Sequence, residues 1–154
     1  MNKPQFKVCL INKDAIMPSF KKYGDAGMDL CSVEEKIIEP KSFCTVGTGL
    51  KFEIPYGYEI QIRSRSGLAS KYGIAVLNAP GTIDYGYRGE IMAILFNTSD
   101  KPFKVEKGMR ICQMVVSKLD EFDLQQVDFI DENTERKSAG LGSTGLKWLT
   151  IYQS

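Results

Sequence analysis

The sequence predicts an all-β fold built from a chain of 154 residues. Short apolar segments rich in β-branched and aromatic residues recur between Gly, Pro, Asn and Asp, which is the pattern of strands separated by tight turns. Apolar and polar residues alternate in Tyr58–Arg63, as they do in a strand with one buried face. Many short strands with Gly- and Pro-rich turns favour a compact sandwich or jelly roll.

Seven segments are expected to form strands. They are Phe6–Ile11, Met28–Ser32, Gly49–Ile54, Gly57–Arg63, Glu90–Asn97, Phe103–Val105 and Met109–Leu119. Only the segment Ser66–Tyr72 is expected to be helical, with Ser66 as its N-cap. From about residue 133 the chain is polar and rich in Gly and Ser. We therefore expect a β domain over residues 1–132 and a flexible C-terminal arm over residues 133–154, which orders only over a ligand.

Composition excludes several classes of protein. The 20 basic and 19 acidic residues give a formal charge of +1, so no net field attracts nucleic acid. The first apolar run, Val8–Ile11, is too short for a signal peptide, and no run approaches a membrane span. Four cysteines without a CxxC pair indicate free thiols in a reducing compartment. We expect a cytoplasmic protein without nucleic-acid or membrane partners, or a nuclear or host-cytosolic one if the source is eukaryotic or viral.

The sequence contains no histidine. This absence removes Ser-His and Cys-His nucleophile pairs and the common zinc sites that use histidine. A hydrolase with this composition would have to use a carboxylate base, an oxygen-ligated metal ion, or both.

The stretch from Arg63 to Glu90 combines three devices that suit a nucleotide. Ser66 and the exposed amides at the start of a helix can hold phosphate, and Arg65 can add a charge-assisted fork. Taken alone, the same residues would form a simple helix cap. The second device is an Asn that can pair with a base. The third is a tight hairpin that follows this Asn and bears a carboxylate.

The hairpin is expected between Gly81 and Gly89, with two tyrosines around a glycine at its tip. An aromatic ring at this place can pack flat against a sugar, and Asp84 can activate water. Asn78 supplies the donor and the acceptor that a pyrimidine edge requires. Ordinary turn chemistry would also explain Asp and Gly here, so the set carries more weight than its members.

Three further segments are site candidates, each with a plainer interpretation. Asp29 begins an apolar strand and is equally consistent with a turn residue. Alternation in the segment that begins at Gly108 predicts that Arg110 and Gln113 lie on opposite faces of a core strand. The small and basic residues of Arg136–Gly145 could cradle a phosphate, although they do not form a P-loop and a flexible tail has the same composition.

Five motifs in this order resemble those of the trimeric dUTPase family. They read AGMDL, RSGLASKYG, NAPGTIDYGYRG, GMRICQM and RKSAGLGSTG, and together they span nearly the whole chain. The resemblance implies a distorted jelly-roll subunit, a homotrimer and three active sites at subunit junctions. It also implies Mg²⁺-dependent hydrolysis of dUTP to dUMP and pyrophosphate, which keeps uracil out of DNA and supplies dUMP for thymidylate synthesis.

The resemblance also implies roles for individual residues. Asp84 would activate water, Tyr87 would pack on deoxyribose and exclude ribose, and Asp29 would reach Mg²⁺ through water. The uracil readers would be Asn78, Thr82 and Ile83, with Met92 lining the pocket. The phosphate contacts would be Arg65, Ser66, Gly67 and Gln113, closed by Arg136, Gly142, Ser143 and Thr144.

Motif five departs from the family pattern. Leu141 replaces a phenylalanine that stacks on uracil, and Lys137 and Ala139 replace glycines. Two alternatives remain at this point. A dCTP deaminase of the same fold needs a glutamate on the strand after the hairpin, where Ile91–Phe96 is wholly apolar. A dUTP-sensing regulator of the same fold is the other alternative.

Overall fold

The computed structural model describes residues 3–138 and 140. The described residues divide into two units, with the division between Glu121 and Phe122. In the second unit the described residues are exposed and irregular. No helix in the described part of the chain is long and apolar enough to span a membrane.

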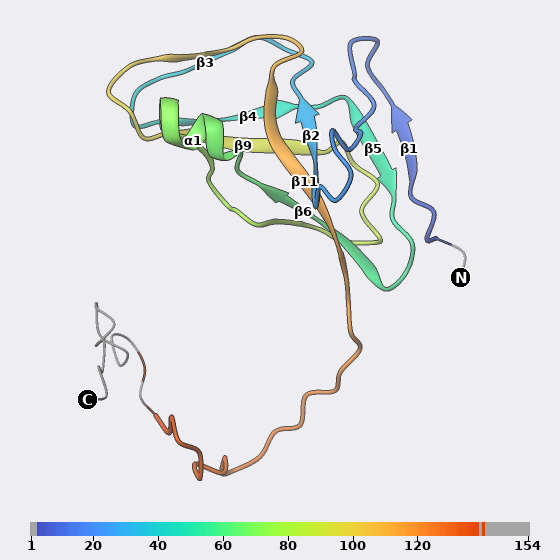
Figure 1. Cartoon of the computed structure of the whole chain (residues 1–154), viewed down its shortest axis with the longest axis vertical. Coiled ribbons are helices and arrows are strands. Elements are labelled where there is room, and N and C mark those ends of the chain that lie inside the picture. Colours follow the sequence, from blue (N-terminus) through green and yellow to red (C-terminus); the bar gives the residue numbers. More distant parts are fainter. Residues whose placement is uncertain (1–2, 139, 141–154) are drawn as a thin grey trace, which may run out of the picture. The chain divides into compact units, whose positions relative to one another are not determined.

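Within its described residues, the first unit contains eleven strands and one short helix (Figure 1). The strands are β1 (Lys7–Leu10), β2 (Gly27–Cys31), β3 (Lys36–Ile38), β4 (Phe43–Gly47), β5 (Leu50–Glu53), β6 (Tyr58–Arg63), β7 (Ile74–Val76), β8 (Gly81–Ile83), β9 (Met92–Asn97), β10 (Phe103–Val105) and β11 (Arg110–Lys118). The helix, α1, spans Ser66–Tyr72. The expectation of an all-β fold with one helix is confirmed.

The strands form four sheets, and every pairing between them is antiparallel. The largest has the order β2-β11-β6-β8, and a second has the order β4-β9-β7. Two further pairs, β1 with β5 and β3 with β10, complete the set. Most partners lie far apart in the sequence, as in a jelly roll.

The core lies where the inward faces of these sheets meet. In β6 the alternation read from the sequence buries Ile60 and Ile62, and in β9 it buries Ala93 and Leu95. A cluster of buried aliphatic side chains from both larger sheets continues this core. The core fixes the register of the strands, and the register in turn positions the polar residues at the strand ends.

All seven expected strands are present, with ends shortened by one or two residues at most positions. Four strands were not expected, namely β3, β4, β7 and β8. Each has only three to five residues. Such short segments have too little period of their own, and they become strands because a partner strand supplies their hydrogen bonds.

The bounds predicted for the helix are confirmed, but its N-cap was wrong. Arg65 is the N-cap, with extended backbone and no side-chain capping bond, and Ser66 is already helical. The carbonyl of Arg65 accepts from the N–H groups of Leu68 and Ala69, at 3.1 and 3.0 Å. At the other end Gly73 has φ of 68°, a left-handed conformation that favours glycine.

The prediction of a hairpin between Gly81 and Gly89 was also wrong as a strand ladder. β8 pairs with β6, whereas β9 pairs with β4 and β7. The segment between β8 and β9 therefore carries the chain from one sheet to another. A tight turn remains at its tip, because the N–H of Tyr87 donates to the carbonyl of Asp84 at 3.0 Å.

A third correction concerns Arg110 and Gln113, which were expected on opposite faces of β11. The register shifts between Arg110 and Cys112, and both Ile111 and Cys112 are buried. A β-bulge of this kind adds one residue to the count and reverses the alternation beyond it. Arg110 therefore contacts Asp29, which is also the cross-strand partner of Gln113.

Candidate active site

A row of polar residues crosses three strands of the largest sheet. Gln113 on β11 pairs with Asp29 on β2 and with Arg63 on β6. The amide of Gln113 donates to the carbonyl of Ser64 at 2.9 Å, just beyond β6. Arg63 is turned to Gln61, whose Oε1 accepts from its Nε at 3.0 Å. The row therefore brings Asp29 of motif one and Gln113 of motif four to one end of the sheet, beside the residues that directly precede motif two.

Asp29 is shared by two guanidinium groups. Arg65 Nε donates to its Oδ1 at 2.8 Å, and Arg110 Nη1 donates to its Oδ2 at 3.0 Å. Arg65 Nη1 also donates to the carbonyl of Arg110 at 2.9 Å. The side chain of Asp29 is only 19% exposed, and charge-assisted bonds in such a setting fix geometry strongly. The cluster of Asp29, Arg65 and Arg110 holds one net positive charge beside the start of α1.

The start of α1 is open. Ser66 and Gly67 are exposed, and a Cβ atom on Gly67 would meet nothing within 4 Å. Their amides precede the first hydrogen bonds of the helix. An anion placed there would meet backbone donors together with the positive cluster of Asp29, Arg65 and Arg110.

Gln113 is held closely by its neighbours. A Cβ atom on Gly27 would stand 2.6 Å from Gln113 Oε1, so glycine allows the amide to lie against β2. Ser64 Oγ accepts from the N–H of Val76 at 2.8 Å and ties the end of β6 to β7. These contacts preset the part of the site that would bind phosphate.

The motif-three residues surround β8. Asn78 lies before this strand, with its amide nitrogen 3.2 Å from the place a Cβ of Gly81 would occupy. Thr82 is exposed and Ile83 is partly buried within the strand. Asp84 and Tyr87 follow it in the exposed turn, and Met92 is the exposed first residue of β9.

The phosphate-binding candidates around Gln113 and the motif-three residue Asp84 do not meet within one chain. Ile83 pairs with Ile60, so the ladder continued by one residue brings Asp84 opposite Glu59. Arg63, beside Gln113, lies four residues further along β6, which corresponds to roughly 13 Å along the strand. Asp84 is therefore remote from Gln113 and Arg63 of the same subunit.

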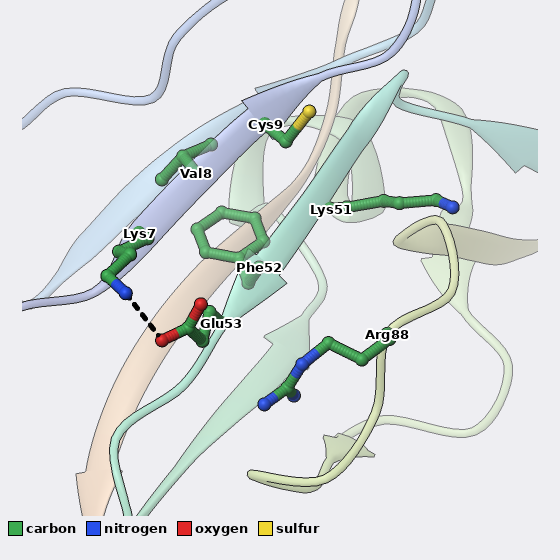
Figure 2. A pocket seen from close by; sticks show the side chains of 7 residues that line it. All are labelled: Lys7, Val8, Cys9, Lys51, Phe52, Glu53 and Arg88. Carbon is green, nitrogen blue, oxygen red and sulfur yellow. Dashed lines mark hydrogen bonds and ion pairs between the residues drawn. The ribbon is translucent and has the colours of Figure 1, made fainter.

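Sequence reasoning missed three residues that shape these groups. Arg110 became a partner of Asp29 only through the bulge. Glu90 and Arg88 hold the turn after β8, because Glu90 accepts from the N–H of Gly49 and Arg88 donates to the carbonyls of Tyr85 and Tyr87. Arg88 also lines a surface pocket of about 260 Å³ with Lys7, Lys51 and Glu53 among others (Figure 2). The charge of Arg88 near the end of motif three, and that of Glu90 directly after the motif, was the only signal in the sequence for these two residues.

Two pKa shifts mark the surroundings of the site. Burial, with a smaller contribution from the charge of Asp29, raises the pKa of the Cys112 thiol to about 12. The hydrogen bond and charge of Lys7 lower the pKa of Glu53, and the charge of Arg88 acts in the same direction. All four cysteines are free, and Cys9 is exposed whereas Cys31 and Cys112 are buried.

The donor set limits how a Mg²⁺ ion could be held. Among the described residues no group of three or more His, Cys, Asp or Glu side chains could cage a metal. Both oxygens of Asp29 already accept from arginines. These residues fit an ion that is ligated by phosphate oxygens and waters, with Asp29 at most in the outer shell.

The motif-five residues lie mostly outside the described part of the chain. Arg136 is described and exposed. The predictions for Leu141, Gly142, Ser143 and Thr144 concern residues that the structure does not describe. The same holds for Ala139.

Comparison with known proteins extends over nearly the whole chain. The dUTPase family model matches residues 13–145. A deoxyuridine 5'-triphosphate nucleotidohydrolase of Clostridium tetani is 48% identical over 94% of this chain and 99% of its own length. The protein of the same name from Alkaliphilus metalliredigens is 50% identical over 92% of this chain and 97% of its own length.

Solved structures with a similar fold are also dUTPases. The dUTPase of Staphylococcus bacteriophage 80alpha, solved with dUPNHPP, superposes with a TM-score of 0.85 at 29% identity. That match covers 92% of this chain and 99% of the phage protein. A dUTPase from phage phi11 of S. aureus matches with a TM-score of 0.76 at 24% identity, which concerns the fold alone. The family model and the curated relatives agree with the five motifs, and the chain belongs to the dUTPase family.

Proposed function

We propose that this chain hydrolyses dUTP to dUMP and pyrophosphate. Membership of the dUTPase family supports the reaction, and the relatives that are about half identical carry the name of this enzyme. The observation that carries the proposal is that the motifs supply two kinds of residue group that hydrolysis of a nucleotide needs. One group offers an exposed carboxylate beside an aromatic ring, and the other offers open amides beside two arginines.

The reaction assigns a role to each group. A carboxylate oxygen of Asp84 accepts a proton from water, and the water oxygen bonds to the α-phosphorus as the bond to the bridging oxygen breaks. Arg65 and Arg136 counter the charge of the leaving pyrophosphate. Ser66, Gly67 and Gln113 orient the phosphates for in-line attack.

The base and sugar are recognised at motif three. Asn78, with the backbone of Thr82 and Ile83, pairs with uracil, and Met92 lines the pocket. The ring of Tyr87 packs on deoxyribose and leaves no space for a 2′-hydroxyl. A missing hydrogen bond or a steric overlap would then discriminate against dCTP, dTTP and UTP.

Mg²⁺ is the cofactor of the proposed reaction. When bound, the ion neutralises charge on the phosphate oxygens. Asp29 would reach it through water, because its own oxygens are engaged by Arg65 and Arg110. The chain's contribution is to orient the triphosphate rather than to build a metal cage.

The active form is proposed to be a homotrimer with shared sites. The separation of Asp84 from Gln113 within one subunit supports this arrangement, because a neighbouring subunit can bring the missing group. Residues 1–132 would form the β domain, and the arm over residues 133–154 would close over a site. Leu141 would then cover the base, and Gly142, Ser143 and Thr144 would bind the terminal phosphate.

A cytoplasmic location completes the proposal, and the free thiols are consistent with a reducing compartment. The deciding assay is pyrophosphate release from dUTP, dCTP, dTTP and UTP with Mg²⁺. Strong preference for dUTP supports the proposal. Comparable kcat/KM for UTP and dUTP would rule out the role of Tyr87, and ammonia release from dCTP would indicate a deaminase. Binding of dUTP without turnover would leave only the regulator.

A further inference from the structure

The ring of Tyr87 lies against the backbone of its own turn. A Cβ atom on Gly89 would overlap the hydroxyl oxygen of Tyr87 and would stand 2.5 Å from Cζ and 3.0 Å from Cε2. Real Cβ atoms are not found so close to other heavy atoms, so this position of the ring requires a glycine at position 89. The φ angle of Gly89 lies outside the left-handed region. Steric space, and not backbone conformation, is therefore what Gly89 provides.

The hydroxyl end of the ring has a fixed partner. Tyr87 donates to the carbonyl of Glu90 at 3.0 Å. Glu90 is itself anchored, because its Oε1 accepts from the N–H of Gly49 at 2.8 Å. The next residue, Ile91, is buried, and its N–H donates to the carbonyl of Leu50 at 2.8 Å. The acceptor for the tyrosine is thus attached to the junction of β4 and β5.

Arg88 holds the backbone of the same turn. Its Nη1 donates to the carbonyl of Tyr85 at 2.6 Å and to that of Tyr87 at 2.9 Å. Its side chain lines the pocket in which Lys7 and Glu53 pair at 2.8 Å (Figure 2). Hydrogen bonds therefore hold both the backbone of the turn and the hydroxyl end of the Tyr87 ring. Tyr87 as a residue nevertheless remains 44% exposed, so it can present a surface to a ligand.

We infer that Gly89 and Glu90 set the selectivity for deoxyribose by holding the ring of Tyr87 in one orientation. Neither residue needs to touch the nucleotide. The inference rests on the proposed function and extends it from the ring to the residues that aim it. A ring free to rotate would yield to a 2′-hydroxyl, whereas a ring fixed at its hydroxyl end and against Gly89 would exclude it.

The chain offers a matched control within the same turn. A Cβ atom on Gly86 meets nothing within 4 Å, and Gly86 is also outside the left-handed region. Gly89→Ala and Gly86→Ala therefore add the same methyl group three residues apart, and only the first displaces the ring. Glu90→Ala removes the anchor on Gly49, whereas Glu90→Gln retains an oxygen that can accept from the same N–H.

The experiment measures kcat/KM for dUTP and UTP, and Kd for dUMP and UMP, in each full-length variant. Gly89→Ala should lower both deoxyribose-to-ribose ratios by about tenfold, and Gly86→Ala should change them less than about twofold. Glu90→Ala should lower the ratios and Glu90→Gln should restore them. The Kd ratio reports on the sugar alone, so a purely structural loss of turnover would not move it.

Each failure has a separate meaning. A wild-type protein that does not hydrolyse dUTP overturns the proposed function. A wild-type enzyme whose Gly89→Ala variant keeps both ratios overturns the inference. If Gly89→Ala does not fold by circular dichroism, the two Glu90 variants decide, and equal ratios in both would overturn it as well.

Discussion

The carboxylate of Asp29 shows how one side chain organises a site at the residue scale. It accepts from Arg65 and Arg110, which are separated by 45 positions in the sequence. Arg65 in turn donates from Nε to Asp29 and from Nη1 to the carbonyl of Arg110. The proposed phosphate-binding arginine is therefore oriented before the ligand arrives, and preorganisation of this kind lowers the cost of binding.

The role proposed for Asp84 predicts a selective loss of turnover. Asp84→Asn keeps the shape of the side chain and removes the base, so kcat should fall by roughly two to four orders of magnitude. Nucleotide affinity should change far less. Steady-state kinetics beside a titration with a non-hydrolysable dUTP analogue tests both.

The control for this variant is Asp100→Asn. Asp100 is exposed, and in the described part of the chain it forms a surface ion pair with Lys41 at 3.0 Å. A surface pair of this kind contributes little, so activity should be unchanged. If Asp84→Asn keeps most of its turnover, Asp84 is a turn residue and the mechanism is wrong.

The shared carboxylate predicts that Arg110 acts through Arg65. Arg110→Gln removes one of the two guanidinium partners of Asp29. KM for dUTP should rise by about tenfold, with a smaller effect on kcat, because the change loosens binding more than chemistry. Pyrophosphate release at varied dUTP concentration gives both constants.

Lys104→Gln provides the matched loss of charge. Lys104 lines the same cavity as Arg65 and Arg110, but it lies 3.6 Å from Glu35 and from Glu106. Its removal should leave KM near the wild-type value. An equal rise of KM in both variants would mean that general positive charge, and not the position of Arg65, governs binding.

At the scale of elements, β11 contributes to both the core and the site. Its bulge lets Ile111 and Cys112 be buried together while Arg110 and Gln113 reach the polar row. In a regular strand the side chain of either Arg110 or Gln113 would point into the core. The bulge therefore reconciles an apolar core with two functional side chains on one strand.

Burial of Cys112 on β11 predicts a pH dependence of stability. The pKa of its thiol is raised from 9.0 to about 12, mainly by burial. The unfolded chain ionises this thiol first, so the stabilising contribution is complete below pH 9 and is lost as the pH rises from 9 towards 12. Urea unfolding midpoints between pH 7 and 10.5 measure the slope.

Cys112→Ala is the comparison for this slope, because it removes the titrating group and leaves the other three cysteines in place. Its decline in stability above pH 9 should be shallower than that of the wild type. A thiol reagent at pH 8 should label the exposed Cys9 much faster than Cys112. Rapid labelling of Cys112 in the folded protein would contradict its burial.

At the scale of the molecule, Asp84, the proposed catalytic carboxylate, and the phosphate-binding candidates are separated along β6. If the proposed roles hold, a single subunit offers two incomplete half-sites. Closed cyclic assemblies place the same two surfaces of neighbouring subunits together at every interface. This separation favours sites shared between subunits, and the number of three subunits in the proposal comes from the resemblance to the dUTPase family.

Shared sites predict that two inactive variants complement each other. Asp84→Asn and Gln113→Ala should each be nearly inactive alone. After the two are mixed, unfolded and refolded together, about a quarter of the junctions should pair an intact Asp84 with an intact Gln113. Activity should return to that extent, and a mixture without refolding serves as the control. Failure to recover any activity would place both residues in a site within one subunit.

The sequence by itself determined the class of fold and the composition of the site. Alternation in β6 and the Gly and Pro punctuation are local signals, so they predicted the strands with a clear period and the bounds of α1. The resemblance of the five motifs to the dUTPase family identified Asp84, Tyr87, Arg65 and Gln113 as candidates, because motifs are read directly from the sequence. The all-β prediction and the family assignment are confirmed; the roles of the individual site residues stay predictions.

Tertiary structure decided what depends on pairing between distant segments. Strand register cannot be read from a short stretch of sequence. It determines the bulge on β11, the placement of β8 and β9 in different sheets, and the hydrogen bond from Arg110 to Asp29. The strands β3 and β7 likewise exist because partners supply their hydrogen bonds. The identity of a residue is given by the sequence, whereas the direction in which its side chain points depends on how the sheets pack. Only the fold could therefore show that the absence of a Cβ atom on Gly89 makes room for the ring of Tyr87.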